Sequence, residues 1–174
     1  PKVLRRLHVL GADISMTPGW NWGRGVYHCL AATIAYGHMG FQPFGDTALA
    51  GRYYYLMQQL QSRYVMIPAT QVLYHHAGRM VPISEALKQG DPLQSQVRVT
   101  YANGLEVYAN CNPTSRWPVE VGGQRRDLSP DSWAAVLGDE FEEYCTEVDG
   151  VRIGYVRSPA YLFADGGGTW HDFA

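Results

Sequence analysis

The spacing of apolar residues changes near residue 90, and this change constrains the fold more than any other feature of the sequence. Before residue 90, apolar side chains recur with the 3.6-residue period of amphipathic helices; after it they alternate, as in half-buried strands, between glycine-containing turns. We therefore expect an α+β protein. An α/β segment with two main helices would occupy residues 1–90, and an antiparallel, sandwich-like β domain would occupy residues 91–174.

Two helices are predicted in the first segment. Over residues 24–36 an apolar stripe ends at Gly37, a residue suited to the left-handed conformation that closes a helix. A second stripe covers residues 46–62. Shorter elements are predicted as strands over 9–15 and 71–75 and as one helical turn over 84–87 with Ser84 as its N-cap.

The register of two hairpins follows from which rows of apolar side chains can share a face. Around Asn103–Gly104, a three-residue loop pairs Val99 with Val107 and keeps both rows together, whereas a two-residue loop would separate them. At Asp149–Gly150 the rows already match across a two-residue type I′ loop. Further strands are predicted over 117–121, 132–137, 160–164 and 169–173.

Charge and cysteine content limit the partners. The 14 basic and 16 acidic residues give a net charge of −2, which offers no basic surface, so we expect no nucleic-acid partner. No apolar run approaches the roughly 20 residues of a membrane span, so we expect no membrane partner either. Cys29, Cys111 and Cys145 are too few for a disulfide framework and lack zinc-site spacing, which predicts buried free thiols. Nothing in the sequence assigns a compartment.

The segment Gly19–Gly25 combines two indoles, an amide and a guanidinium with three glycines. Trp20 and Trp22 could stack on sugar rings while neighbouring polar groups bond hydroxyls; alternatively, the indoles fill the core and the glycines only permit a turn. At the end of the first helix, His38 could either bind substrate or cap helix carbonyls. The candidate ligand-binding residues are therefore Trp20, Asn21, Trp22, Arg24 and His38.

No catalytic set stands out in the sequence. The densest acidic run, over residues 139–143, is predicted to be a solvated strand edge and not an acid/base pair. There is no G-x-S-x-G nucleophile motif. His75 and His76, adjacent on a predicted strand, would point to opposite faces, and we expect neither a metal nor a cofactor. Catalytic residues are left unassigned.

Several short motifs together carry a resemblance: Ala35–Phe41, Tyr101–Asn110, Trp117, Leu128–Pro130 and Tyr161–Gly166. In this pattern the chain resembles the C-terminal region of bacterial glycoside-hydrolase-like proteins, in which a (β/α)8 barrel is followed by a β-sandwich domain. The resemblance implies partial barrel-like βα units in the first segment and carbohydrate as the partner. It also implies catalytic carboxylates on barrel strands that precede Pro1.

Two functions are consistent with these observations. The first is the C-terminal portion of a carbohydrate-active, glycoside-hydrolase-like protein that is not catalytically complete alone. The alternative is a non-enzymatic module that binds glycan or assembles with protein. Because a cut barrel leaves strands and apolar helix faces open, we expect either a missing N-terminal barrel or a homo-oligomer that buries the helices over 24–36 and 46–62.

Overall fold

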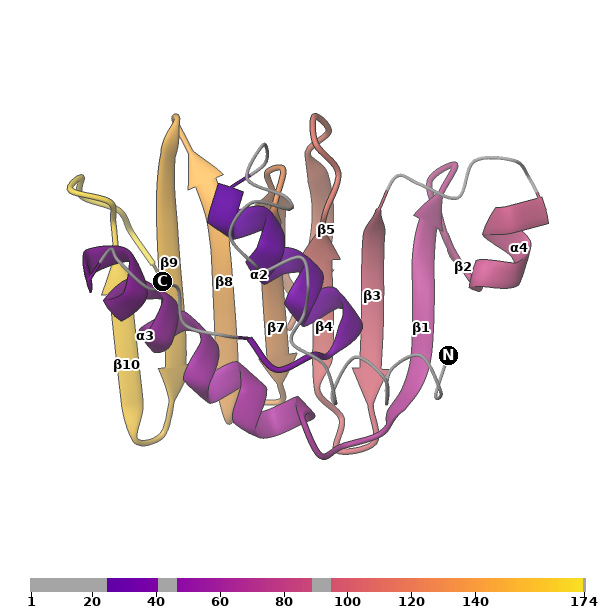
Figure 1. The fold of residues 1–174 in the computed structure, drawn as a ribbon, viewed down its shortest axis with the longest axis horizontal. Coiled ribbons are helices and arrows are strands. Elements are labelled where there is room, and N and C mark those ends of the chain that lie inside the picture. The colour runs from indigo at the N-terminus through magenta and orange to yellow at the C-terminus, as the bar shows by residue number, and fades with distance from the viewer. Residues whose placement is uncertain (1–24, 41–46, 89–94, 174) are drawn as a thin grey trace.

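The computed structural model describes residues 25–40, 47–88 and 95–173, and these form three layers. Two helices cover one face of an eight-stranded sheet (Figure 1), and a separate two-stranded hairpin packs on the other face. The helices are α2 (Gly25–Tyr36), α3 (Thr47–Tyr64) and α4 (Ile83–Lys88). The strands are β1 (Ala69–His76), β2 (Arg79–Val81), β3 (Gln96–Tyr101), β4 (Glu106–Asn110), β5 (Trp117–Val121), β6 (Gln124–Leu128), β7 (Ser132–Leu137), β8 (Phe141–Val148), β9 (Val151–Ser158) and β10 (Tyr161–Asp165).

The large sheet has the strand order β10-β9-β8-β7-β4-β3-β1-β2, and each of its described pairs is antiparallel. The hairpin β5–β6 forms the second sheet. Helices together with a mostly antiparallel sheet and a packed hairpin confirm the α+β class and the sandwich-like arrangement. β1 and β2, which precede residue 90, are hydrogen-bonded into the same sheet as the later strands.

Both hairpin registers predicted from the apolar rows are confirmed. Val99 pairs with Val107, and Gly104 has a φ of 87°, as the three-residue loop requires. At the second hairpin, Asp149 and Gly150 both have positive φ, 50° and 79°, as a type I′ turn needs. Turn chemistry and side-chain alternation therefore determine these two registers.

Helix α2 ends as the sequence predicts. Gly37 has a φ of 64°, its N–H donates to the carbonyl of Ile34, and the N–H of His38 donates to the carbonyl of Thr33. This pair of bonds is a Schellman motif, which satisfies two carbonyls that the helix leaves open. The start of α4 differs from the prediction: Ser84 lies inside the helix, and the carbonyl of Pro82 accepts the N–H of Glu85.

The main core lies between the helices and the sheet. Leu30 and Ile34 of α2 and Leu56 and Leu60 of α3 are all at most 1 % exposed. Close packing at α3 depends on Gly154 of β9, because a Cβ there would lie 2.9 Å from a terminal carbon of Leu56. A second apolar cluster joins the other face of the sheet to the hairpin, with Tyr108, Trp117, Val119, Leu128, Tyr144 and Ile153 among its members.

Three strand predictions need correction. β2, only three residues long, is absent from the strands that the sequence predicts. β6 was not predicted, because its sequence Gln-Arg-Arg-Asp-Leu lacks the alternation of a half-buried strand and is held by pairing with β5. Residues 169–173 were predicted as a strand, but the tail continues without one, and the ring of Phe173 stacks on Tyr155 at 5.7 Å. The predicted strand over 9–15 lies outside the described residues.

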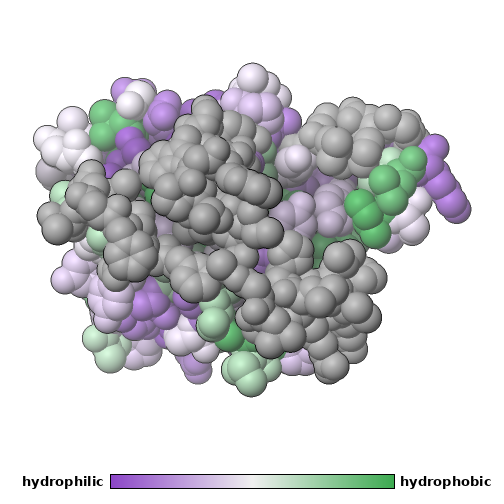
Figure 2. Space-filling view, in the orientation of Figure 1, coloured by the Kyte–Doolittle hydropathy of each residue, from purple (hydrophilic) through white to green (hydrophobic). Residues whose placement is uncertain are grey.

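At the β1–β2 end of the large sheet, opposite to β10, a helix lies beside the strands. Helix α4 packs beside β1, and Figure 2 shows hydrophobic residues gathered there at the right of the view, where Ile83 and Leu87 are exposed. Among the described helices, none is long and apolar enough to cross a membrane.

Candidate binding groove

A groove of about 390 Å³ opens where the hairpin β5–β6 leans over the large sheet. Strand β8 contributes Tyr144, Thr146 and Val148, and β6 forms the facing side. The lining is completed by Asp149, in the turn after β8, and by Arg116, the residue before β5. The lining from β6 consists of Arg125, Arg126, Asp127 and Leu128. Three arginines and two aspartates therefore line the groove.

Arg126 is held in place between the hairpin and the sheet. Its guanidinium donates to Glu142 at 2.6 Å and lies 4.1 Å from the centre of the Tyr144 ring. The Glu142 carboxylate also lies 3.8 Å from Arg157. A guanidinium fixed by a carboxylate and an aromatic face keeps its orientation toward the groove at little entropic cost.

Arg116 and Asp127 form an ion pair beside the groove. The Nε of Arg116 donates to Asp127 at 2.5 Å, and its terminal nitrogen donates to the carbonyl of Glu147 at 3.0 Å. Arg125 differs from both other arginines, since it is exposed and its side chain makes no hydrogen bond or ion pair within the part of the chain that the structure describes. Arg125 is therefore the guanidinium that a ligand can engage without breaking an existing contact.

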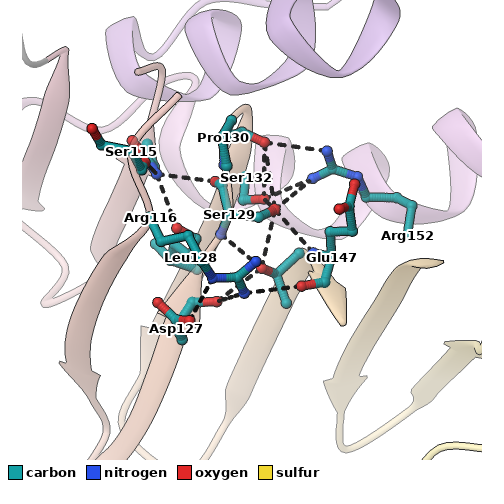
Figure 3. Close-up of polar contacts among 11 residues, drawn as sticks. Ser115, Arg116, Asp127, Leu128, Ser129, Pro130, Ser132, Glu147 and Arg152 are labelled. Atoms are coloured by element: carbon teal, nitrogen blue, oxygen red, sulfur yellow. Dashed lines mark hydrogen bonds and ion pairs between the residues drawn. The ribbon is translucent and has the colours of Figure 1, made fainter. Parts of the chain in front are cut away.

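Behind the groove, a polar network ties the end of β6 to the sheet (Figure 3). The hydroxyls of Ser129 and Ser132 are 2.6 Å apart, and Arg152 donates to Ser132 at 2.7 Å and to the carbonyl of Pro130 at 3.2 Å. Figure 3 shows Arg116 and Asp127 on one side of this network and Arg152 on the other.

The same network anchors the chain segment that follows β6. Buried Asn110 donates to the carbonyls of Ser115, Leu128 and Ser129, at 2.9, 2.9 and 3.0 Å. Thr146 accepts the N–H of Ser129 at 3.0 Å. Since so many bonds converge behind β6, its arginines stand on a rigid support.

Glu143 contradicts the prediction of a solvated acidic edge. It faces the helix side of the sheet, is 0 % exposed, and accepts a hydrogen bond from the indole N–H of Trp133 at 2.7 Å. Burial raises the pKa of its carboxyl well above the usual range, against the smaller opposing effects of the Trp133 bond and the charge of Arg63. A raised pKa suits a general acid, but a fully enclosed carboxyl on the face opposite the groove cannot reach a substrate there.

A histidine and an aspartate also meet across the fold. Nδ1 of His28 in α2 lies 2.8 Å from Asp131, and both side chains are about nine-tenths buried, at 14 % and 13 % exposure. The carbonyl of Asp131 accepts from Arg152 at 3.2 Å, so the pair adjoins the network behind the groove. Its position fastens α2 to the turn before β7.

The sequence-predicted ligand residues are placed as follows. Trp20, Asn21, Trp22 and Arg24 lie outside the described residues, so their sugar-platform role stays a prediction. His38 is 5 % exposed, its ring stacks on Tyr36 at 5.9 Å, and its carbonyl accepts the hydroxyl of Tyr64 at 2.8 Å. Its backbone, not its ring, caps α2.

Sequence reasoning missed the arginines of the groove. The signal that could have found them is the Gly122–Gly123 turn after a clearly alternating strand, which requires a return strand at Gln124–Leu128. All three cysteines are buried free thiols, as predicted. Across residues 25–40, 47–88 and 95–173, no three His, Cys, Asp or Glu side chains gather as a metal site would need.

Comparison of the chain with protein families, characterised proteins and solved structures finds no match.

Proposed function

We propose that this chain is a non-catalytic binding module whose groove holds an acidic glycan. The observation that carries the proposal is that Arg116, Arg125 and Arg126 line one groove of about 390 Å³, with Arg126 lying over the Tyr144 ring. Guanidinium groups bind sugar carboxylates through paired N–H donors.

A binding role is favoured over cleavage by the chemistry that lines the groove. Hydrolysis of a glycosidic bond uses two carboxyl groups across the bond, one of them an acid with a raised pKa. In the groove, Asp127 is already paired with Arg116. Glu143, the buried acid, lies on the other face of the sheet.

In the context that the resemblance implies, the module is the C-terminal portion of a carbohydrate-active hydrolase, and cleavage belongs to carboxylates elsewhere in that protein. The partial barrel units and the sugar platform at Trp20 and Trp22 stay predictions of that context.

The test is a titration followed by NMR, with the backbone amides of β6 and β8 as probes. The ligands are glucuronic and galacturonic acid and their short oligomers, with glucose and galactose as neutral counterparts and acetate as an anion without a ring. We expect the acidic sugars to shift these amides, and we expect their affinity to fall as salt is added. Neutral sugars should bind at least several-fold more weakly.

Arg125→Gln is the informative variant, because Arg125 makes no contact that the fold needs. It should weaken the acidic sugars about two- to fivefold, the share of one exposed ion pair worth about 0.5–1 kcal/mol. Arg79→Gln is the matched control, since Arg79 is an exposed arginine on β2, at the other end of the sheet. Equal binding of acidic and neutral sugars, or equal binding by the two variants, would refute the proposal; acetate binding as tightly as the sugars would reduce it to a simple anion site.

A further inference from the structure

β10 forms one edge of the eight-stranded sheet, and no described strand pairs with its outer side. Along a strand, alternate residues direct their N–H and C=O groups to opposite sides, so part of the β10 backbone points away from β9. Such an edge is a template for another strand. Proteins usually protect it with lysine, proline, a bulge, short length or a covering element.

The β10 strand itself has no lysine, no proline and no bulge to protect its edge. Its sequence Tyr-Leu-Phe-Ala-Asp contains neither lysine nor proline, and its pairing with β9 runs without a bulge over five residues. Its one charge, Asp165, stands at the end of the strand and is paired with Arg52 at 3.1 Å.

The opposite edge of the sheet is protected, which makes the contrast informative. There, β2 has only three residues and is followed by Pro82, and α4 packs beside its neighbour β1. The two edges of the sheet are therefore built differently. Within the described part of the chain, only the β10 edge is suited to pairing with an additional strand.

Apolar side chains flank the open edge on both faces. Leu162, on the face away from α3, is 68 % exposed. On the helix face, Phe163 stacks with Tyr55 at 5.4 Å, and Tyr55 itself is 46 % exposed. A strand added at β10 would therefore remove apolar surface from water in addition to satisfying backbone groups.

We propose that β10 pairs antiparallel with β10 of a second copy, which joins two eight-stranded sheets into one about a two-fold axis. In the register that opposes all five residues, Leu162 of one copy lies opposite Ala164 of the other, and the two Phe163 side chains meet at the axis. Leu162 and Ala164 occupy alternate positions of β10, so both present their backbone groups to the same side.

Charge favours this register over a neighbouring one. With all five residues opposed, each Asp165 faces Tyr161 of the other copy, and the two carboxylates stand about 14 Å apart, four residues at about 3.4 Å each. At that separation salt screens them. A slip that opposes the two Ala164 residues would halve the distance between the carboxylates.

The interface is small. Five-residue strands bury less than the roughly 800 Å² per partner of a stable complex, so the dimer should form with a dissociation constant in the micromolar range or weaker. This association does not depend on the groove, and it differs from the helix-mediated oligomer that the sequence predicts.

The experiment is sedimentation equilibrium of the full chain from about 10 μM to about 1 mM. We expect the average mass to rise from 19.4 kDa toward twice that value. Ala164→Lys places a charge at an exposed position of the edge and should raise the dissociation constant at least about tenfold. Met66→Lys, at an 89 % exposed apolar residue in the turn after α3, is the matched control and should leave the dimer unchanged.

Two further measurements complete the test. Circular dichroism of Ala164→Lys should match that of the unsubstituted chain, and hydrogen exchange at the amides of Leu162 and Ala164 should slow at high concentration in the unsubstituted chain. A mass of 19.4 kDa throughout the range would overturn the proposal. So would a dimer that Ala164→Lys leaves intact; if Tyr54→Lys on α3 dissolved that dimer, the interface would lie on the helices.

Discussion

Replacing Glu143 by glutamine should change how the stability of the protein depends on pH. The Glu143 carboxyl is 0 % exposed, and its Oε2 atom has no hydrogen-bond partner among the described residues. Burial raises its pKa well above its ordinary value of 4.5. Glutamine has nearly the same shape and keeps an acceptor for the indole N–H of Trp133, but it cannot ionise.

The direction of the effect follows from proton binding. Below about pH 4.5 the carboxyl is protonated in both states, so the stabilising effect of its protonation is fully present. As the pH rises toward the folded-state pKa, the folded protein keeps a proton that the unfolded chain has lost. The free energy of unfolding therefore falls by about 1.4 kcal/mol per pH unit while the pH lies between the unfolded-state and folded-state pKa values.

The groups around Glu143 keep their protonation state in the pH range between its two pKa values. Desolvation raises the pKa of Cys145 to about 12, and it raises those of Tyr64 and Tyr161 as well. Arg63 of α3 is the cation whose charge acts on Glu143, and it stays protonated across the interval. The difference between Glu143→Gln and the unsubstituted chain therefore isolates one carboxyl.

The assay is urea unfolding at a series of pH values from 5 to 8. We expect the stability of the Glu143→Gln variant relative to the unsubstituted chain to increase steadily with pH. Glu120→Gln, at an exposed position of β5, is the matched control and should follow the unsubstituted chain. Parallel pH profiles for Glu143→Gln and the unsubstituted chain would refute the reasoning, and a reversed slope would show that Arg63 outweighs desolvation and holds the carboxylate ionised.

Three other substitutions test the packing and the polar surface. Gly154→Ala should destabilise the protein by about 1–3 kcal/mol in urea unfolding, because the added Cβ would press on Leu56. Gly51→Ala, whose Cβ would have no atom within 4 Å, should instead stabilise helix α3 by about 0.5–1 kcal/mol. Equal effects of the two substitutions would contradict the close packing at Gly154. Burial and then the hydrogen bond to Glu106 raise the pKa of Tyr108 to about 12, so Glu106→Gln should lower that pKa in a spectrophotometric titration; an unchanged value would exclude Glu106 as a cause.

The sequence by itself determined the local geometry of the fold. The positive φ available at Gly104 and at Asp149–Gly150, together with the alternation of apolar residues around them, specifies both hairpin registers. Gly37 likewise specifies the end of α2. These features depend on residues close together in the chain, and for that reason the pattern predicts them.

Only the tertiary structure decided where the chemistry lies. Glu143 belongs to an acidic run typical of a surface, yet its strand position turns it toward the helices and encloses it in the core. The groove depends on Arg126 of β6 lying over the ring of Tyr144, which belongs to β8, a strand that follows β6 in the chain and contacts it in space. Contacts between distant segments, and the burial that these contacts create, leave no periodic pattern in the sequence. They arise only when the layers pack together, so the sequence pattern does not predict them.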